Sequence, residues 1–349
     1  MHGLRKEIRI KEIIIETRNC KTFVLESGDE INLFYKAGQF LTFIFNTPSG
    51  EQRRNYSLSS SPALGEPMAI TIKRMPNGVF SRQMVDNATK VDSLITIGAS
   101  GFFTLPDDMS PYQQLFLLAA GSGITPVFSI LKNALQSFDN LRIILIYSNR
   151  SMEEAIFYNA LQQLEKKYPD RFQVEWLFSD AFDHTRSRLG NWLLGELLKK
   201  YVTAPLPKCL FYLCGPLNYM RTITITLLTA GVSRANIRKE EFVITQPFIQ
   251  LQPPETVARE ITVMLNEKQY QFSSAYPQTI LQSAKRAGIE LPYSCETGRC
   301  GTCAAVCKNG NVWMRYNEVL TDEDIRLNKV LTCTGYPVYG DVGLDFDEI

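Results

Sequence analysis

The sequence of 349 residues is poor in several features that would point to particular functions. Its charges nearly cancel, with 37 Lys and Arg against 36 Asp and Glu, so no basic surplus indicates a nucleic-acid partner. Its apolar runs, such as Leu115 to Ala120, are far too short to cross a bilayer, and no membrane insertion is expected. Only two histidines are present, His2 and His184, which leaves little for acid–base catalysis by imidazole.

An apolar signal region is also missing from the N-terminus, M-H-G-L-R-K-E. We therefore expect a cytoplasmic protein, whose eight cysteines are better interpreted as metal ligands or thiols than as disulfides. A chain of this length should form two or three domains, each with its own core.

Four cysteines follow a recognisable pattern near the C-terminus. Three of them read C-x₄-C-x₂-C and the fourth lies thirty residues downstream: Cys295, Cys300, Cys303 and Cys333. This is the spacing with which four thiolates hold a plant-type [2Fe–2S] cluster. Gly298 and Gly301 would let the backbone wrap around such a cluster at little steric cost.

Structural zinc is the main alternative, because it too takes four cysteines. Zinc sites usually pair one C-x₂-C with a second, whereas here the fourth cysteine stands alone. Cys307, Cys20 and Cys209 lie outside the pattern and are interpreted as small buried hydrophobic residues.

The cysteine pattern belongs to a longer resemblance. Residues 261–349 resemble a plant-type ferredoxin domain in an early I-T-V-M-L strand, in T-I-L-Q-S-A-K-R-A-G-I and in the closing V-L-T-C-T-G-Y-P. The resemblance implies an α+β fold of the β-grasp type. The segment holds 11 Asp and Glu against 8 Lys and Arg, a net of −3, so the rest of the chain is +4 within the overall +1. An acidic face of this kind could steer a basic redox partner.

Two changes of composition suggest domain boundaries. The stretch from Gln246 to Glu260 contains paired prolines and is interpreted as a linker, and P-D-D-M-S-P-Y precedes a dense apolar strand near residues 107–112. The expected organisation is a flavin-binding domain over 1–108, a nucleotide-binding domain over 109–245, the linker over 246–260 and the ferredoxin-like domain over 261–349.

The first segment consists of short strand-like runs separated by Gly, Pro, Asn or Asp. They cover residues 8–16, 22–26, 40–45, 54–59, 68–74 and 94–97, with one helix expected over 80–88. Many short strands with a single helix predict an antiparallel β-barrel.

The middle segment has a different pattern of hydrophobic residues. Apolar runs such as Q-L-F-L-L-A-A-G, L-R-I-I-L-I-Y-S, F-Q-V-E-W-L-F-S and C-L-F-Y-L-C-G alternate with helical stretches over 152–167 and 218–230. This alternation predicts a doubly wound α/β domain with a parallel sheet covered on both faces.

The first of these apolar runs leads into A-G-S-G-I-T-P. Gly121 and Gly123 allow a tight turn and close approach to a phosphate, with Thr125 as the expected N-cap and Pro126 as the first helical residue. A helix that begins here would direct its free N–H groups at a pyrophosphate. The third glycine of G-x-G-x-x-G is missing, so the turn alone is weak evidence.

Two further motifs support a nucleotide and flavin site. R-N-Y-S contains Arg54, Tyr56 and Ser57, and C-G-P covers Cys214, Gly215 and Pro216. With the glycine turn between them, these motifs resemble the ferredoxin–NADP reductase superfamily across residues 1–245. The resemblance places the arginine on the flavin phosphates, the tyrosine on the isoalloxazine ring and the serine near flavin N5. The glycine turn and C-G-P would hold the nicotinamide nucleotide.

The resemblance extends to further flavin contacts. They are Lys73, Gly78, Val79 and Ser81, with Phe242 as an aromatic residue near the flavin. A helix capped by Ser81 would suit the pyrophosphate of FAD, although one branch with this domain order uses FMN. Ser57, Thr125 and Cys214 are the residues expected to line the reaction centre.

The choice between NADPH and NADH depends on the end of the second sheet strand, which reads Y-S-N-R-S. No Asp or Glu stands there to bind a ribose 2′-hydroxyl, and Arg150 with Ser148 could instead bind a 2′-phosphate. Glu153 and Glu154 follow directly and would repel that phosphate if they faced it. The pattern favours NADPH over NADH.

The order of flavin, nucleotide and ferredoxin-like segments resembles the reductase components of bacterial multicomponent oxygenases, those of phenylacetyl-CoA epoxidases among them. The resemblance implies electron flow from NAD(P)H through FAD and the [2Fe–2S] cluster to a di-iron or Rieske oxygenase on another chain. Two alternatives stay open: a stand-alone reductase of ferredoxin or small acceptors, and a non-catalytic zinc-binding protein.

Overall fold

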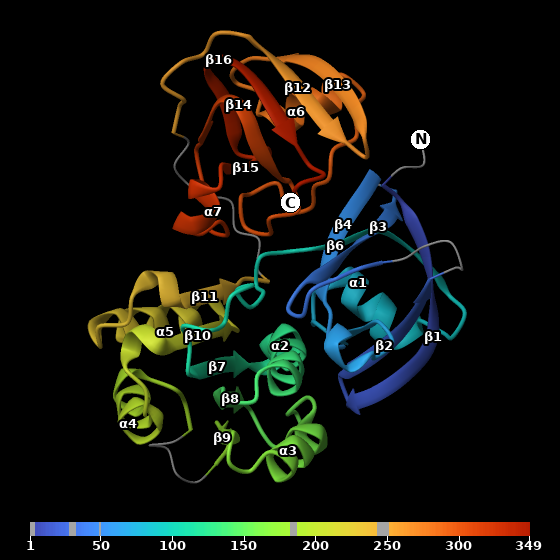
Figure 1. Ribbon diagram of the computed structural model, residues 1–349. Coiled ribbons are helices and arrows are strands. Elements are labelled where there is room, and N and C mark those ends of the chain that lie inside the picture. The colour runs from blue at the N-terminus through green and yellow to red at the C-terminus, as the bar shows by residue number, and fades with distance from the viewer. Residues whose placement is uncertain (1–3, 28–32, 49, 182–186, 243–250) are drawn as a thin grey trace. The chain divides into compact units, whose positions relative to one another are not determined.

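The structure, a computed structural model, describes residues 4–27, 33–48, 50–181, 187–242 and 251–349. These residues form two compact units (Figure 1). The larger unit comprises Lys6–Ala99 and Phe103–Phe242. The smaller unit comprises Ser100–Phe102, the described residues before Lys6 and the segment from residue 251 to Ile349. His2, His184 and residues 246–250 of the predicted linker lie outside the described residues.

The first half of the larger unit is an antiparallel barrel. Its strands are β1 (Lys6–Thr17), β2 (Cys20–Ser27), β3 (Phe40–Thr47), β4 (Gly50–Ser57), β5 (Ala69–Lys73) and β6 (Ser93–Ser100). They follow the order β4-β3-β6-β1-β2-β5, and an antiparallel bridge between Leu58 and Ile70 closes the sheet. Ile8 and Ile10 point into the core while their charged neighbours face outward, which is the period of two expected for a half-buried strand. The predicted barrel is confirmed.

The barrel helix differs from its prediction in type. Over the expected 80–88 the chain forms a short α1 (Val79–Arg82) that continues as a π-helix over Gln83–Asn87. Phe80, Met84 and Val85 bury their side chains in the barrel core. A wider helical turn still places these apolar residues on one face, so the hydrophobic pattern alone did not distinguish the two helix types.

The second half of the larger unit is a parallel sheet between two layers of helices. The strands are β7 (Gln114–Ala120), β8 (Arg142–Asn149), β9 (Phe172–Phe178), β10 (Cys209–Cys214) and β11 (Ile237–Glu240), in the order β11-β10-β7-β8-β9. Helices α2 (Ile124–Ser137) and α3 (Tyr158–Lys167) bury one face, and α4 (Asn191–Tyr201) and α5 (Leu217–Thr229) bury the other (Figure 1). Cover on both faces explains why these strands are apolar throughout.

Three details of this domain differ from the sequence-based expectation. Helix α3 begins at Tyr158 rather than at Met152, because the preceding residues form turns that end with Phe157 at a left-handed φ of 63°. Helix α2 begins at Ile124, with Gly123 as its N-cap, so Thr125 lies inside the first turn and does not cap it. The sequence reasoning did not foresee helix α4 or strand β11.

The smaller unit has the β-grasp fold that the ferredoxin resemblance implied. Its strands are β12 (Arg259–Leu265), β13 (Lys268–Ser274), β14 (Ala304–Met314), β15 (Lys329–Leu331) and β16 (Gly335–Asp345), in the order β13-β12-β16-β14-β15. Helix α6 (Ile280–Arg286), which begins at a capping box of Thr279 and Gln282, packs on this sheet, and α7 (Asp322–Arg326) precedes β15. The cysteine loop connects α6 to β14.

Candidate functional site

The R-N-Y-S motif occupies the end of β4. Tyr56 packs beside Phe43 with 6.0 Å between the ring centroids, and burial raises the pKa of the Tyr56 hydroxyl to about 12. Arg54 is exposed, and its guanidinium carbon lies 4.8 Å from the centroid of the Phe80 ring. Phe80 is flanked by Val79 and Ser81, so the fold brings the motif arginine to the predicted phosphate-binding segment.

The phosphate-binding segment differs from its prediction in the residue that caps its helix. Gly78, not Ser81, is the N-cap of α1. The Ser81 hydroxyl accepts a hydrogen bond from Met75 N at 3.1 Å and donates to the Gly78 carbonyl at 3.2 Å, so it fixes the turn from inside the helix. A Cβ on Gly78 would lie 2.3 Å from the Ser81 Oγ and 2.9 Å from the Met75 Cβ, so a side chain here would displace the serine.

The glycine turn after β7 meets the C-G-P motif at one edge of the parallel sheet. Residues Gly121–Gly123 form a 3-10 turn before α2, and a Cβ on Gly123 would lie 2.1 Å from the Cys214 carbonyl oxygen. The pairing of Ala119 with Cys214 sets these two strand ends side by side. The chain runs outward from β7 through β9 and then returns to β10, so they flank the topological switch point where open α/β sheets bind ligands.

The polar groups at this edge suit a nucleotide. The Thr125 hydroxyl is buried and has no hydrogen-bond partner among the described residues. The Tyr147 hydroxyl donates to the Gly121 carbonyl at 3.0 Å, and the Tyr219 hydroxyl donates to the Ala119 carbonyl at 3.1 Å. These two bonds hold the turn from the neighbouring β8 and α5.

The barrel and the parallel sheet of the larger unit meet at Ser57. Its hydroxyl donates to Glu240 Oε1 at 3.4 Å, and Glu240 pairs in register with Cys214 on the adjacent strand. Enclosure by protein raises the pKa of the Glu240 carboxyl to about 8, and burial raises the pKa of the Cys214 thiol. Glu240 thus lies next to both residues expected at the reaction centre: its carboxyl is bonded to Ser57, and its backbone pairs with Cys214.

Glu240 is a residue that the sequence reasoning missed. The signal was a pair of glutamates that directly precede Phe242, which the resemblance had already placed near the flavin. Phe242 itself is 46% exposed and follows the end of β11.

The predicted 2′-phosphate contacts lie at the end of β8. Ser148 pairs in register with Ala120, next to the glycine turn. Arg150 is largely exposed, with its Nη1 3.9 Å from Glu154 Oε1. Lys73, predicted as a flavin contact, also approaches this carboxylate, at 3.7 Å from Oε2. Glu154 therefore faces two of the cations assigned to cofactors.

The four pattern cysteines of the smaller unit are gathered as two pairs. Cys295 is hydrogen-bonded with Cys300, and Cys303 with Cys333. The Cys300 bond, with further bonds from Thr297 and Arg299, lowers the pKa of the Cys295 thiol to about 5 despite its burial. Within the described chain no three His, Cys, Asp or Glu side chains converge on one metal ion. Two pairs match a cluster in which two irons share four thiolates.

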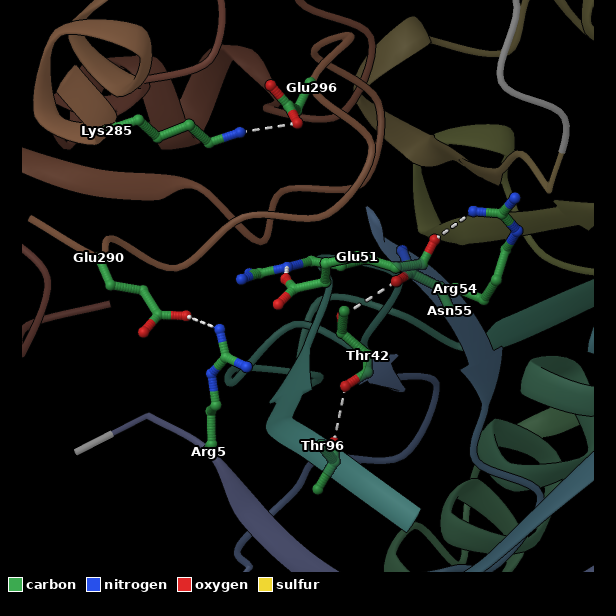
Figure 2. A network of polar contacts seen from close by, with 10 residues as sticks. Arg5, Thr42, Glu51, Arg54, Asn55, Thr96, Lys285, Glu290 and Glu296 are labelled. Carbon is green, nitrogen blue, oxygen red and sulfur yellow. Dashed lines mark hydrogen bonds and ion pairs between the residues drawn. The ribbon is translucent and has the colours of Figure 1, made fainter. Parts of the chain in front are cut away.

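The loop around these cysteines is held by its neighbours. Gly298 and Gly301 have positive φ angles of 75° and 77°, as a tightly wrapped loop requires. The Thr332 hydroxyl donates to the Cys303 carbonyl at 3.0 Å, which keeps Cys333 beside Cys303. Lys285 on α6 forms an ion pair of 2.8 Å with Glu296 (Figure 2).

The residues present fit the three groups that the sequence implies. An exposed Arg54 beside a glycine turn suits a flavin phosphate, and the unpartnered Thr125 hydroxyl beside Gly123 suits a nucleotide. The Thr297 hydroxyl is buried next to the cysteine pairs and could donate to a cluster sulfur. All eight cysteines of the sequence are free thiols.

Comparison with protein families gives three matches along the chain. An oxidoreductase FAD-binding domain matches residues 7–104, an oxidoreductase NAD-binding domain matches 117–224, and a 2Fe-2S iron-sulfur cluster binding domain matches 263–338. These matches favour FAD over FMN and an iron–sulfur cluster over structural zinc. No helix in the described part of the chain is long and apolar enough to cross a membrane.

Relatives of similar length align with almost the whole chain. The ferredoxin reductase component of 3-ketosteroid-9-alpha-monooxygenase from Rhodococcus rhodochrous is 33% identical over 99% of this chain and 98% of its own. One of the subunits of 1,2-phenylacetyl-CoA epoxidase from Escherichia coli is 28% identical over 97% of each chain. The solved structure of phthalate dioxygenase reductase, 22% identical, has the same fold with a TM-score of 0.59 over 98% of both chains.

The fold and the three domain matches define an NAD(P)H-dependent oxidoreductase that uses FAD and a [2Fe–2S] cluster. The chain belongs to the family of ferredoxin reductase components that the Rhodococcus protein represents.

Proposed function

We propose that this protein accepts reducing equivalents from NADPH, in preference to NADH, and delivers them singly to an oxygenase on a separate chain. When bound, FAD supplies hydride acceptance and the [2Fe–2S] cluster supplies one-electron transfer. The contribution of the protein is to position these groups, because the cofactors carry the chemistry.

The proximity of Ser57, Cys214 and Glu240 is the observation that supports the proposal. Ser57 belongs to the barrel strand with the flavin motif, whereas Cys214 and Glu240 end two strands of the nucleotide-binding sheet. A nicotinamide held at that strand end would lie against a flavin held by the barrel. Ser57, Thr125 and Cys214 would then border the reacting rings, with Glu240 positioned behind the serine.

The remaining assignments follow the same division. Arg54 would bind the flavin phosphates together with the Gly78 turn, Val79 and Ser81, and Tyr56 would pack on the ring, near Phe242. Gly121, Gly123, Pro126, Gly215 and Pro216 would surround the nucleotide, with Ser148 and Arg150 at its ribose. Cys295, Cys300, Cys303 and Cys333 would bind the cluster. The proposed domains are residues 1–108, 109–245 and 261–349, with the linker over 246–260.

The oxygenase partner is inferred from relatives of similar length. They are named as reductase components or subunits of 3-ketosteroid-9-alpha-monooxygenase, glycine betaine monooxygenase and 1,2-phenylacetyl-CoA epoxidase. Because the names differ in substrate while the reductases align over almost their whole length, we assign substrate choice to the partner. A Rieske or di-iron oxygenase is the expected acceptor, with phenylacetyl-CoA epoxidase as one candidate. Cysteines that serve as metal ligands or thiols and form no disulfide favour the cytoplasm as the compartment.

Replacement of one cluster ligand tests the electron path. Cys300→Ser should abolish NAD(P)H-dependent reduction of cytochrome c, a one-electron acceptor, and should spare reduction of ferricyanide at the flavin. Cys307→Ser is the matched control, because Cys307 lies four residues after Cys303 and outside both thiol pairs, and it should keep both activities.

Loss of both activities in Cys300→Ser would contradict a modular path. Reconstitution with a purified Rieske or di-iron oxygenase then tests the partner by substrate turnover per NADPH consumed. Rapid reduction of soluble ferredoxin with no coupling to any oxygenase would favour the stand-alone reductase instead.

A further inference from the structure

A short segment from outside the ferredoxin-like sequence packs on the cysteine loop. Ser100–Phe102 belongs to the smaller unit, although in sequence it follows the barrel strands. Its residues are half-buried, and Phe102 packs against the core of that unit, which includes Cys303 and Cys333. We refer to Ser100–Phe102 as the cover segment.

Phe102 lies directly against the loop at Gly301, between two of the pattern cysteines. A Cβ on Gly301 would come within 2.5 Å of Phe102 Cδ2 and 2.7 Å of Cε2, so the ring contacts the bare Cα of the glycine. The ammonium group of Lys329 lies 5.0 Å from the centroid of the same ring. Lys329 is in turn paired with Asp324 at 2.9 Å, which fixes its position. The ring is thus enclosed between the loop and β15.

Ser100 contributes a polar contact to the same loop. Its hydroxyl lies 3.0 Å from the Thr302 hydroxyl, and Thr302 lies 3.4 Å from the Cys300 sulfur. A cysteine that binds iron is a thiolate and can only accept hydrogen bonds. The Thr302 hydroxyl would then donate to the sulfur, and the Ser100 hydroxyl would be the donor to Thr302.

We propose that the cover segment is a positioning element for the iron–sulfur cluster, in which Phe102 excludes water from the loop at Gly301 and Ser100 orients the Thr302 hydroxyl towards the Cys300 sulfur. The inference rests on the proposed function, since it assigns the cluster to these cysteines. Solvent exposure and hydrogen bonds to sulfur are two of the factors that set the reduction potential of such clusters.

The two residues should affect that potential in opposite directions. Reduction adds negative charge to the cluster, and water or hydrogen-bond donors stabilise the added charge. Phe102→Ala admits water, so the potential becomes more positive and a ferrous chelator removes the cluster several-fold faster. Ser100→Ala removes the donor behind Thr302, so the potential becomes more negative. Phe102→Tyr keeps the ring and should behave as the wild type.

The experiment uses the full-length protein loaded with flavin and cluster. The readouts are the midpoint potential, the electron paramagnetic resonance spectrum of the reduced cluster and the rate of its bleaching by chelator. Ile325→Ala on α7 is the control for loss of an exposed apolar side chain from the same unit. If Phe102→Ala does not retain its cluster on purification, Phe102→Leu provides the same measurements with a smaller expected shift.

Wild-type potential and bleaching rate in Phe102→Ala or Phe102→Leu, or shifts of the same sign for Phe102→Ala and Ser100→Ala, would overturn the proposal. A wild-type protein without any iron–sulfur absorption would overturn the proposed function as well. The two failures are therefore distinguishable by the spectrum of the unaltered protein.

Discussion

The hydroxyl of Ser57 and the carboxyl of Glu240 form a hydrogen bond of 3.4 Å between residues that are 183 positions apart in the chain. The contact joins the last residue of β4 to the last residue of β11. Its carboxyl is enclosed by protein, which raises the pKa of Glu240 to about 8 from an ordinary value of 4.5. At neutral pH the group is therefore mostly protonated and can act as a donor.

Glu240→Gln should change how stability depends on pH. A carboxyl whose folded pKa is raised is neutral in both states below about pH 4.5, and the folded state is disfavoured progressively as the pH rises towards 8. Glutamine removes that effect. The melting temperature of the flavin-free variant, relative to that of the flavin-free wild type, should therefore rise between pH 5 and pH 9. Each unit of pKa shift is worth about 1.4 kcal/mol, so a gain of several degrees is expected.

Calorimetry in matched buffers at pH 5, 7 and 9 provides this measurement, with Glu241→Gln as the control for loss of an adjacent carboxylate. A constant difference between the Glu240 variant and the wild type across this range would show that Glu240 titrates normally.

The contact between Ser57 and Glu240 could not be predicted from the sequence. The residues of the flavin and nucleotide motifs could be proposed from the sequence because each motif is local and needs specific residue types. Glu240 carries no local pattern, and its role depends on parallel pairing with Cys214, which sets it opposite the barrel. A contact across 183 positions becomes visible only when the strands are in place.

The same limit explains the errors in the fold. The barrel and the parallel sheet followed from hydrophobic alternation and from apolar runs, which depend on burial alone. The start of α3 and the N-cap of α2 were wrong because they depend on backbone conformation, such as the positive φ of Phe157. The grouping of Phe102 with the C-terminal unit follows from tertiary packing, which no local pattern encodes.

Arg54→Ala should weaken flavin binding. The exposed guanidinium beside the Gly78 turn is assigned to the flavin phosphates, and a hydrogen bond to a charged group contributes about 1.5–3 kcal/mol. We therefore expect the Kd for FAD to rise about 10- to 100-fold, measured by fluorescence of titrated apoprotein. Arg9→Ala removes another exposed arginine of the same barrel and should leave the Kd unchanged. Equal effects of the two substitutions would indicate only a general loss of positive charge.

Arg150 and Glu154 should have opposite effects on the choice of nucleotide. Arg150→Ala should lower kcat/KM for NADPH about tenfold and leave NADH nearly unchanged, because only NADPH carries the 2′-phosphate. Glu154→Gln should raise kcat/KM for NADPH, because it removes a carboxylate 3.9 Å from Arg150 and 3.7 Å from Lys73. Steady-state kinetics with both nucleotides provides the test, with NADH as the internal control. Parallel changes for the two nucleotides in Arg150→Ala would place this arginine away from the 2′-position.

Gly123→Ala should damage both nucleotide binding and stability. The added Cβ would lie 2.1 Å from the Cys214 carbonyl oxygen and 2.9 Å from Gly215 N, and backbone atoms cannot move aside as a flexible side chain can. We expect a loss of about 1–3 kcal/mol in the free energy of unfolding and a large rise in KM for the nucleotide, since β7 and β10 must separate.

Gly195→Ala in α4 is the matched control. A Cβ there meets no atom within 4 Å, so the substitution should stabilise the helix by about 0.5–1 kcal/mol and leave KM unchanged. Denaturant unfolding and nucleotide kinetics on both variants separate the two effects. A Gly123→Ala protein with normal KM would mean that the close contact between the glycine turn and the C-G-P strand end is not needed to hold the nucleotide.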